Sequence, residues 1–89
     1  MASQEKRVDA NITTHKRKTG KGQFTIPIRY CRQICVGPGD MVWLVIKTPD
    51  GAHLFSGEKK LSSGTEIYGP DISAVLEPGQ PIRVTMSRQ

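Results

Sequence analysis

The sequence has few of the residues that stabilise a small protein covalently. Its two cysteines, Cys31 and Cys35, stand four apart in a stretch expected to be helical, so a disulfide between them would close almost no loop. We therefore expect reduced thiols on one helix face, as in cytosolic proteins. Aromatic residues are also scarce, with two Phe, two Tyr and one Trp in 89 residues. Because a chain this short buries only about 60% of its unfolded surface, dimerisation is the expected source of further stability.

Long apolar runs are absent as well. The longest, residues 41–46, has the length of a strand, whereas a membrane-spanning helix needs about 20 apolar residues. The N-terminus has no apolar run of the kind found in signal peptides. The expectation is a cytoplasmic protein with no membrane association.

The patterns that carry catalysis or metal binding are missing too. His15 and His53 lie far apart, with no nucleophile motif or carboxylate pair beside them. Neither a Cys-x2-Cys nor a His-x3-His pair occurs, which disfavours a zinc site. Gly20 and Gly22 fall short of a phosphate-binding loop, because the Gly-Lys-Ser/Thr ending is absent. We predict no catalytic residue, no metal and no cofactor, and a protein that is not an enzyme.

What the sequence does have is a strongly uneven distribution of charge. Residues 1–35 carry eight Lys and Arg against two acidic residues, whereas residues 36–89 carry five against six. No acidic residue occurs between Asp9 and Asp40. Such asymmetry is typical of a protein that binds a polyanion, nucleic acid above all.

Periodicity and turn residues predict a mostly β protein with one short helix. Residues 1–11 are polar and aperiodic, which indicates a flexible N-terminal arm. Trp43 lies within the clearest strand, where we favour packing in the core over an exposed face for a partner. The expected elements are a weak strand within 11–18, a strand at 23–26, a helix at 28–36, strands at 41–47 and 52–55, the frayed end of that strand or a loop at 56–60, a brief strand at 65–68, a helical turn or strand at 72–76 and a final strand at 81–86.

One stretch echoes another forty residues later. Residues 36–46 and residues 76–86 each read as an apolar residue, a Pro-Gly turn and a strand with alternating apolar positions. Either the fold contains two copies of one unit, or turns followed by strands share a common pattern. We favour the second interpretation.

A longer motif carries a family resemblance. The segment Gly20-Lys21-Gly22-Gln23-Phe24-Thr25-Ile26-Pro27 is followed by a short helix, then by Gly37-Pro38-Gly39-Asp40 and a strand. This arrangement resembles the SpoVT/AbrB-like (AbrB/MazE) swapped-hairpin DNA-binding family over about residues 12–57. The resemblance implies a β-barrel formed by an intertwined homodimer. It divides the chain into the arm at 1–11, a DNA-binding domain at 12–57 and a C-terminal β-containing extension at 58–89, expected to be folded.

The resemblance and the charge pattern together imply contact with double-stranded DNA. Basic residues of the first strand, the glycine turn and the short helix would make this contact with DNA. The chain departs from the family at Cys31, where an Arg is usual, and carries Arg29 nearby instead. The predicted DNA-binding residues are Lys16, Arg17, Lys18, Lys21, Gln23, Arg29 and Arg32.

Two functions fit these observations. The first is a dimeric transcriptional regulator that occupies promoter DNA. The second is an antitoxin or another protein-interaction module whose C-terminal segment binds a partner protein. Wrapping tails are usually acidic and unstructured, whereas residues 58–89 are nearly balanced in charge and contain turn signals. The regulator is therefore preferred.

Overall fold

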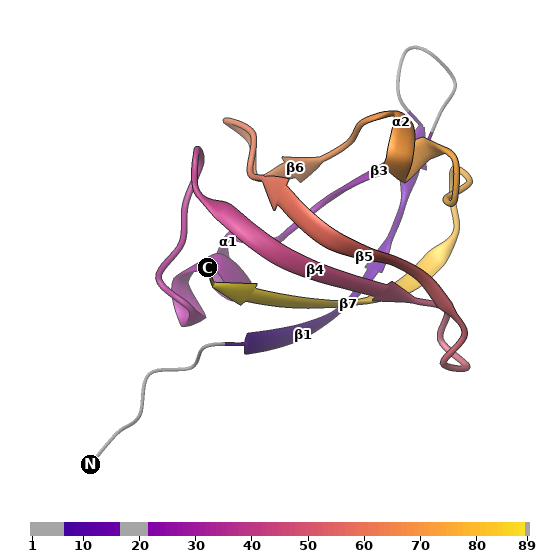
Figure 1. Ribbon diagram of the computed structural model, residues 1–89, viewed down its shortest axis with the longest axis horizontal. Helices are drawn as coiled ribbons and strands as arrows, with labels where there is room; N and C mark the ends of the chain where they lie inside the picture. Colours follow the sequence, from indigo (N-terminus) through magenta and orange to yellow (C-terminus); the bar gives the residue numbers. More distant parts are fainter. Residues whose placement is uncertain (1–6, 17–21, 89) are drawn as a thin grey trace.

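The computed structural model describes residues 7–16 and 22–88, which form two small sheets with two short helices between strands (Figure 1). The larger sheet has the strand order β1-β7-β4-β5, and the smaller has the order β2-β3-β6. All strand pairs are antiparallel. The elements in chain order are β1 (Arg7–Thr13), β2 (His15–Lys16), β3 (Gly22–Thr25), α1 (Ile28–Gln33), β4 (Met41–Lys47), β5 (His53–Lys60), β6 (Glu66–Ile67), α2 (Pro70–Ser73) and β7 (Pro81–Arg88).

The two middle strands of the larger sheet follow from simple alternation. In β4, Val42, Leu44 and Ile46 are fully buried, while the residues between them face outward. β7 alternates in the same way, with its apolar residues directed to the same side. Successive side chains in a strand point to opposite faces, so both strands present one apolar face to the core. The mostly β architecture expected from the sequence is confirmed.

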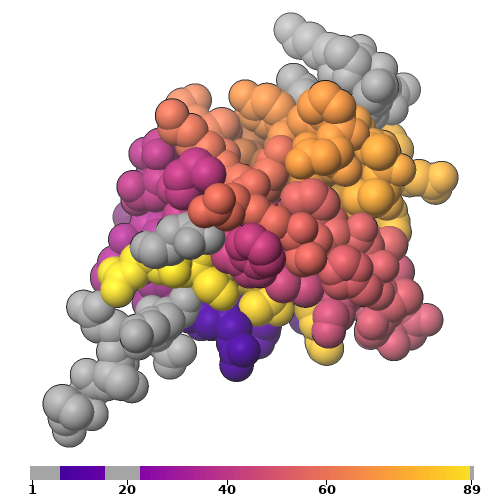
Figure 2. Space-filling view, in the orientation of Figure 1, coloured from indigo at the N-terminus to yellow at the C-terminus, as the bar shows by residue number. Residues whose placement is uncertain are grey.

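One hydrophobic core serves the whole described chain. It lies between the inner face of the larger sheet and residues of the smaller sheet, the helices and the loops. The expected boundary at residues 57 and 58 falls inside β5, and β7 pairs with both β1 and β4. In Figure 2 the yellow atoms of the C-terminal strand lie between indigo atoms of β1 and magenta atoms of the middle of the chain. Residues 58–88 are therefore part of the same core as the first half.

The turns that precede the two middle strands are held by strand ends from the opposite half of the chain. The Thr14 N–H donates to the carbonyl of Gln80 (2.9 Å), and the Gly79 N–H donates to the carbonyl of Thr14 (3.0 Å). In the same pattern, the Leu61 N–H donates to Asp40 (3.0 Å), and the Gly39 N–H donates to Leu61 (2.8 Å). The first half of the chain (β1 to β4) thus fixes the turn before β7, and the second half (β5 to β7) fixes the turn before β4.

The side chains and backbone of these two turns also correspond. Gly39 and Gly79 both have positive φ, 93° and 76°, which glycine adopts without steric cost. Asp40 Oδ2 accepts the Gly37 N–H at 2.8 Å, and Gln80 Oε1 accepts the Glu77 N–H at 2.9 Å. The forty-residue echo in the sequence is therefore also an echo in the structure.

Three elements differ in extent from the sequence expectation. The flexible arm was expected to reach residue 11, but residues from Arg7 onward form β1, because β7 offers a complete set of backbone partners. β5 continues to Lys60, through the stretch expected to be a frayed strand end or a loop, because β4 pairs with it along its length. Helix α1 ends at Gln33, three residues early.

Two side-chain expectations were wrong. Trp43 is 43% exposed, because Val42 and Leu44 occupy the buried positions of β4 and leave Trp43 on the outer face. The cysteines do not share a face: Cys31 is buried and Cys35 is exposed. Cys35 lies beyond the helix and has a φ of 59°. No helix among residues 7–16 and 22–88 is long and apolar enough to cross a membrane.

The Thr14 hydroxyl tests the coupling between the halves. It donates to the carbonyl of Glu77 and accepts the Gln80 N–H at 2.8 Å in a nearly buried position. Thr14→Val keeps the shape but leaves the Gln80 N–H without this acceptor, so we expect a loss of about 1–3 kcal/mol in the free energy of unfolding by urea. The neighbouring exposed Thr13→Val should change it by less than about 0.5 kcal/mol. Equal effects of the two variants would contradict the coupling.

Candidate nucleic-acid interface

The predicted DNA-binding residues do not lie in one place. Arg17, Lys18 and Lys21 fall outside the described residues. Lys16 belongs to β2, where its backbone pairs with Gly22 at the start of β3. Helix α1, which carries Arg29 and Arg32, begins at Ile28, beyond the far end of β3. Extended chain rises about 3.3 Å per residue, so roughly 20 Å of chain separates Gly22 from α1.

Gln23 is placed in the interior. Its side chain is only 7% exposed, and its Nε2 donates to Oε2 of Glu66 at 2.8 Å. The bond joins β3 to β6, which pair through Phe24 and Ile67. Gln23 therefore connects the two halves, and its amide already has a protein partner.

Helix α1 presents two arginines to solvent because its other side is anchored. Cys31 is fully buried, and Ile34 at the end of the helix is buried with it. Arg29 and Arg32 are exposed, and Arg32 lies in the last turn, where the helix dipole favours a cation. The Arg29 guanidinium lies 4.8 Å from the centre of the Tyr30 ring, and its Nη2 is 3.4 Å from the Tyr30 hydroxyl. The ring thus limits the directions in which Arg29 extends.

The end of the larger sheet near α1 collects further cations. There β1 begins at Arg7, β7 ends at Arg88 and β5 ends at Lys60, which pairs with Met41 at the start of β4. Helix α1 contacts β1, and Cys35 and Val36, which follow α1, line one cleft with Arg88; Figure 1 shows α1 at this end of the larger sheet. We call this surface the basic end. It comprises Arg7, Arg29, Arg32, Lys60 and Arg88.

The acidic groups nearby are few, and one of them is already engaged. The Asp40 carboxylate accepts the Gly37 N–H, which fixes the turn before β4. Glu58 lies on β5, opposite Trp43, two residues before Lys60. A cleft of about 290 Å³ at this end is lined by Cys35, Val36, Asp40, Met41 and Arg88. The basic end therefore has a hollow as well as an excess of positive charge.

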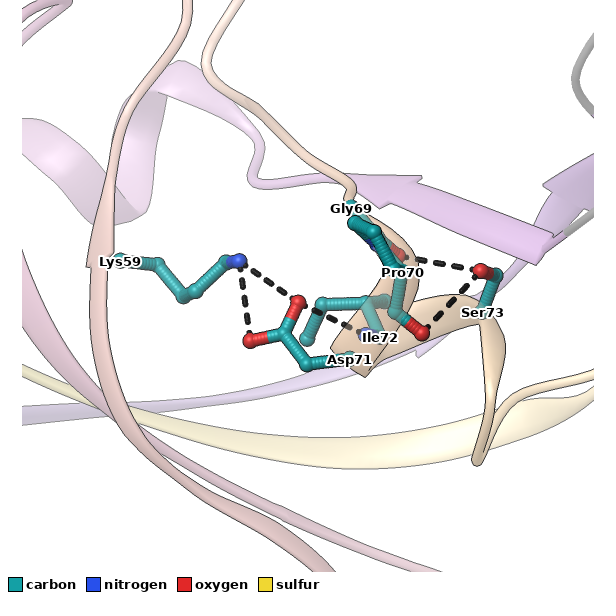
Figure 3. A network of polar contacts seen from close by, with 6 residues as sticks. All are labelled: Lys59, Gly69, Pro70, Asp71, Ile72 and Ser73. Carbon is teal, nitrogen blue, oxygen red and sulfur yellow. Dashed lines mark hydrogen bonds and ion pairs between the residues drawn. The ribbon is translucent and has the colours of Figure 1, made fainter.

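Lys59 does not add to this charge. Its Nζ lies 2.9 Å and 3.1 Å from the two carboxylate oxygens of Asp71 on α2 (Figure 3). The Lys59 side chain is 18% exposed, and that of Asp71 is 50% exposed. The hydrogen bond from Lys59 lowers the pKa of the Asp71 carboxyl below its ordinary value of 3.8. This pair ties β5 to α2 and neutralises one cation.

The described residues give little support to other chemistry at this site. Burial raises the pKa of the Cys31 thiol, which keeps it in the poorly nucleophilic protonated form. Within residues 7–16 and 22–88, no three His, Cys, Asp or Glu side chains lie close enough together to hold a metal ion. What the basic end offers is a positively charged surface with a cleft.

Sequence reasoning found two residues of the basic end and missed three. Arg29 and Arg32 lie in the basic first part of the chain, where the excess of Lys and Arg predicts binding residues. Arg7, Lys60 and Arg88 come from positions far apart in sequence. Only the strand register brings them to one end of the sheet, and register depends on long-range pairing that no local pattern specifies.

Comparison with known proteins gives a fold and no family. No protein-family model matches this chain, and no curated protein matches it either. The chain is similar in structure to a protein described as the solution structure of PHS018 from Pyrococcus horikoshii. The TM-score is 0.67 and the sequences are 19% identical, over 90% of this chain and 88% of that chain. The likeness shows a shared fold over nearly the whole length of both chains.

The Lys59–Asp71 pair predicts a dependence of stability on pH. Because the pKa of Asp71 is lowered in the folded state, the pair stabilises the fold above the ordinary Asp value of 3.8 and stops doing so as the pH falls below it. Asp71→Asn should therefore lower the urea midpoint at neutral pH and match the wild type in more acidic buffer. A difference that stays the same at both pH values would assign the effect to packing instead of charge.

Proposed function

We propose that this protein binds double-stranded DNA through the basic end and acts as a regulator of transcription. The gathering of five cations from α1 and three strand ends supports the proposal. Lys and Arg neutralise phosphates and release counterions from the duplex. Arginine also donates two parallel hydrogen bonds to guanine in the major groove, and the exposed Arg29 and Arg32 are suited to that role.

We also propose that the two halves of the chain form a swapped-hairpin barrel within one molecule. The family resemblance implies such interleaving between two chains. Here each half holds the turn of the other through Thr14 and Leu61, and the two middle strands β4 and β7 come from different halves. One chain thereby supplies both partners of the exchange. The predicted homodimer then serves DNA binding, where two basic ends engage one duplex, and folding does not require it.

The antitoxin alternative loses its main support in this arrangement. It needs a C-terminal segment that is free to wrap a partner protein. Residues 58–88 instead provide part of β5, all of β6, α2 and β7, and several fully buried side chains, including Ile72 and Val84. Releasing this segment would open the core. The regulator is therefore the function we propose.

Binding to duplex DNA can be measured by fluorescence anisotropy of a labelled mixed-sequence duplex at several salt concentrations. Contact with about five phosphates per basic end gives a log-log salt slope of roughly −4.5 for each bound copy, and about twice that for a dimer. Arg29→Ala/Arg32→Ala should make the slope shallower by about 1.8 for each bound copy and weaken binding roughly tenfold or more. The change is expected because two exposed cations are removed without disturbing the buried side of α1.

A charge-matched control is Lys47→Ala/Arg83→Ala, which removes two exposed cations at the opposite end of the larger sheet. It should bind the duplex nearly as the wild type does. If both double variants lose the same affinity, binding depends on net charge alone and the basic end has no special role. If the wild type does not bind the mixed-sequence duplex at low salt, the proposal that the basic end makes sequence-independent contacts with DNA is wrong.

Interleaving within one chain predicts a concentration-independent melting temperature. An obligate intertwined dimer gains stability with protein concentration by mass action, whereas a chain that completes its own core does not. Thermal unfolding followed by circular dichroism over a hundredfold range of concentration separates the two. A melting temperature that rises steadily with concentration would support interleaving between two chains instead.

A further inference from the structure

The outer face of the larger sheet carries a large aromatic side chain that nothing in the described chain covers. Trp43 and Met41 are each 43% exposed, while the alternate residues of β4 are fully buried. Trp43 is also the only tryptophan in the sequence. Exposed apolar side chains that gather in a patch mark surfaces for interaction.

The apolar part of this face is one strand wide. It consists of Met41, Trp43 and the half-buried Val45 on β4. Trp43 has Glu58 of β5 on one side and Ser87 of β7 on the other. A protein interface of standard size buries about 800 Å² on each partner around an apolar centre, which such a stripe does not supply. A single aromatic ring with polar neighbours is instead suited to stack on a flat base.

Cations stand at both ends of the stripe. Arg7 and Lys60 lie at the end near Met41. At the other end Lys47 and Arg83 pair directly across β4 and β7, an arrangement of like charges that destabilises a sheet unless an anion offsets it. Neither Lys47 nor Arg83 has an ion pair or a side-chain hydrogen bond within the described residues.

The Lys47–Arg83 pair borders a hollow. On the neighbouring strands, Asn11 of β1 pairs with Arg83, and His53 of β5 pairs with Lys47. Together with the Lys47–Arg83 pair, this makes one row across all four strands polar or basic. A cleft of about 450 Å³ lies here, lined by Asp9, Ala10, Asn11, Lys47, Gly51, Arg83 and Thr85. Among the described strand residues, the two carboxylates on this face are Asp9, which accepts a hydrogen bond from Thr85 at 2.6 Å, and Glu58. Four cations thus outnumber them.

We propose that this outer face binds unpaired nucleotides, with a base stacked on Trp43 and phosphates held at the Arg7/Lys60 and Lys47/Arg83 ends. From Met41 to Lys47 the strand spans about 20 Å, which accommodates a few nucleotides. The combination of a cationic track and an aromatic platform is how proteins hold single strands of DNA or RNA without sequence preference. This site shares Arg7 and Lys60 with the basic end proposed for duplex DNA, but Trp43 and the Lys47/Arg83 pair lie outside that surface.

The sole tryptophan makes a direct test possible. A short oligothymidylate, and in a second arm an oligouridylate, is titrated into the protein while Trp43 fluorescence is followed, with N-acetyltryptophanamide as the control for absorption by the oligonucleotide. Stacking should quench the emission in a saturable manner, and quenching by one of the two only assigns the site to DNA or to RNA. Absence of quenching by both would overturn the proposal.

Variants separate stacking from charge in the anisotropy of labelled oligonucleotides. Trp43→Ala should weaken binding about 5- to 150-fold, and Trp43→Phe should recover part of the affinity, because stacking contributes about 1–3 kcal/mol per base. Lys47→Ala/Arg83→Ala should make the salt slope shallower by about 1.4. Arg29→Ala/Arg32→Ala should leave this binding unchanged, so failure here and failure at the duplex site are distinguishable.

The alternative occupant of this face is a second copy of the chain. Sedimentation velocity of the wild type and of Trp43→Ala, without nucleic acid, decides between them. A dimer that Trp43→Ala abolishes, together with oligonucleotide binding that this variant leaves intact, would assign the face to self-association and overturn the proposal. The circular dichroism spectrum of Trp43→Ala, whose side chain lies outside the core, verifies that the variant is folded.

Discussion

Four backbone hydrogen bonds, two around Thr14 and two around Leu61, couple the halves of this protein. Each pair joins the end of one strand to the turn before a middle strand of the other half. The turns set the directions of β4 and β7, which pair side by side. These two strands carry most of the buried aliphatic side chains of the larger sheet. Neither half has a complete inner face without the other. The single core, the position of α1 and the basic end all depend on this exchange.

Local sequence patterns anticipated the strands that have apolar residues of their own, above all β4 and β7. The bounds of β4 follow from the run Met41 to Lys47, and the turn at residues 48–51 follows from its Pro and Gly. The same reasoning shortened β5, because Ser56 to Lys60 has no apolar alternation of its own and is held as a strand by β4. It also missed β1, whose strand character comes from β7, near the other end of the described chain.

The candidate sites show the same division. Charge composition pointed to α1, and Arg29 and Arg32 are exposed there because Cys31 anchors the opposite side. The contributions of Arg7 and Lys60 depend on register, which composition does not contain. Trp43 was misplaced for a related reason: a strand with apolar residues at every position leaves open which alternate set faces inward. In the folded chain, Val42, Leu44 and Ile46 pack against the apolar set of β7, and Trp43 is left outside.

Placing both halves in one polypeptide has a consequence for how its surface can diverge. In a symmetric homodimer every substitution is made twice, so a change that suits one copy is imposed on the other. Here the two corresponding helices differ freely: α1 carries Arg29 and Arg32, while α2 carries Asp71 and no basic residue. The acidic group of α2 is engaged in an internal ion pair with Lys59. The two helices thus differ in charge in a way that the corresponding helices of two identical chains could not.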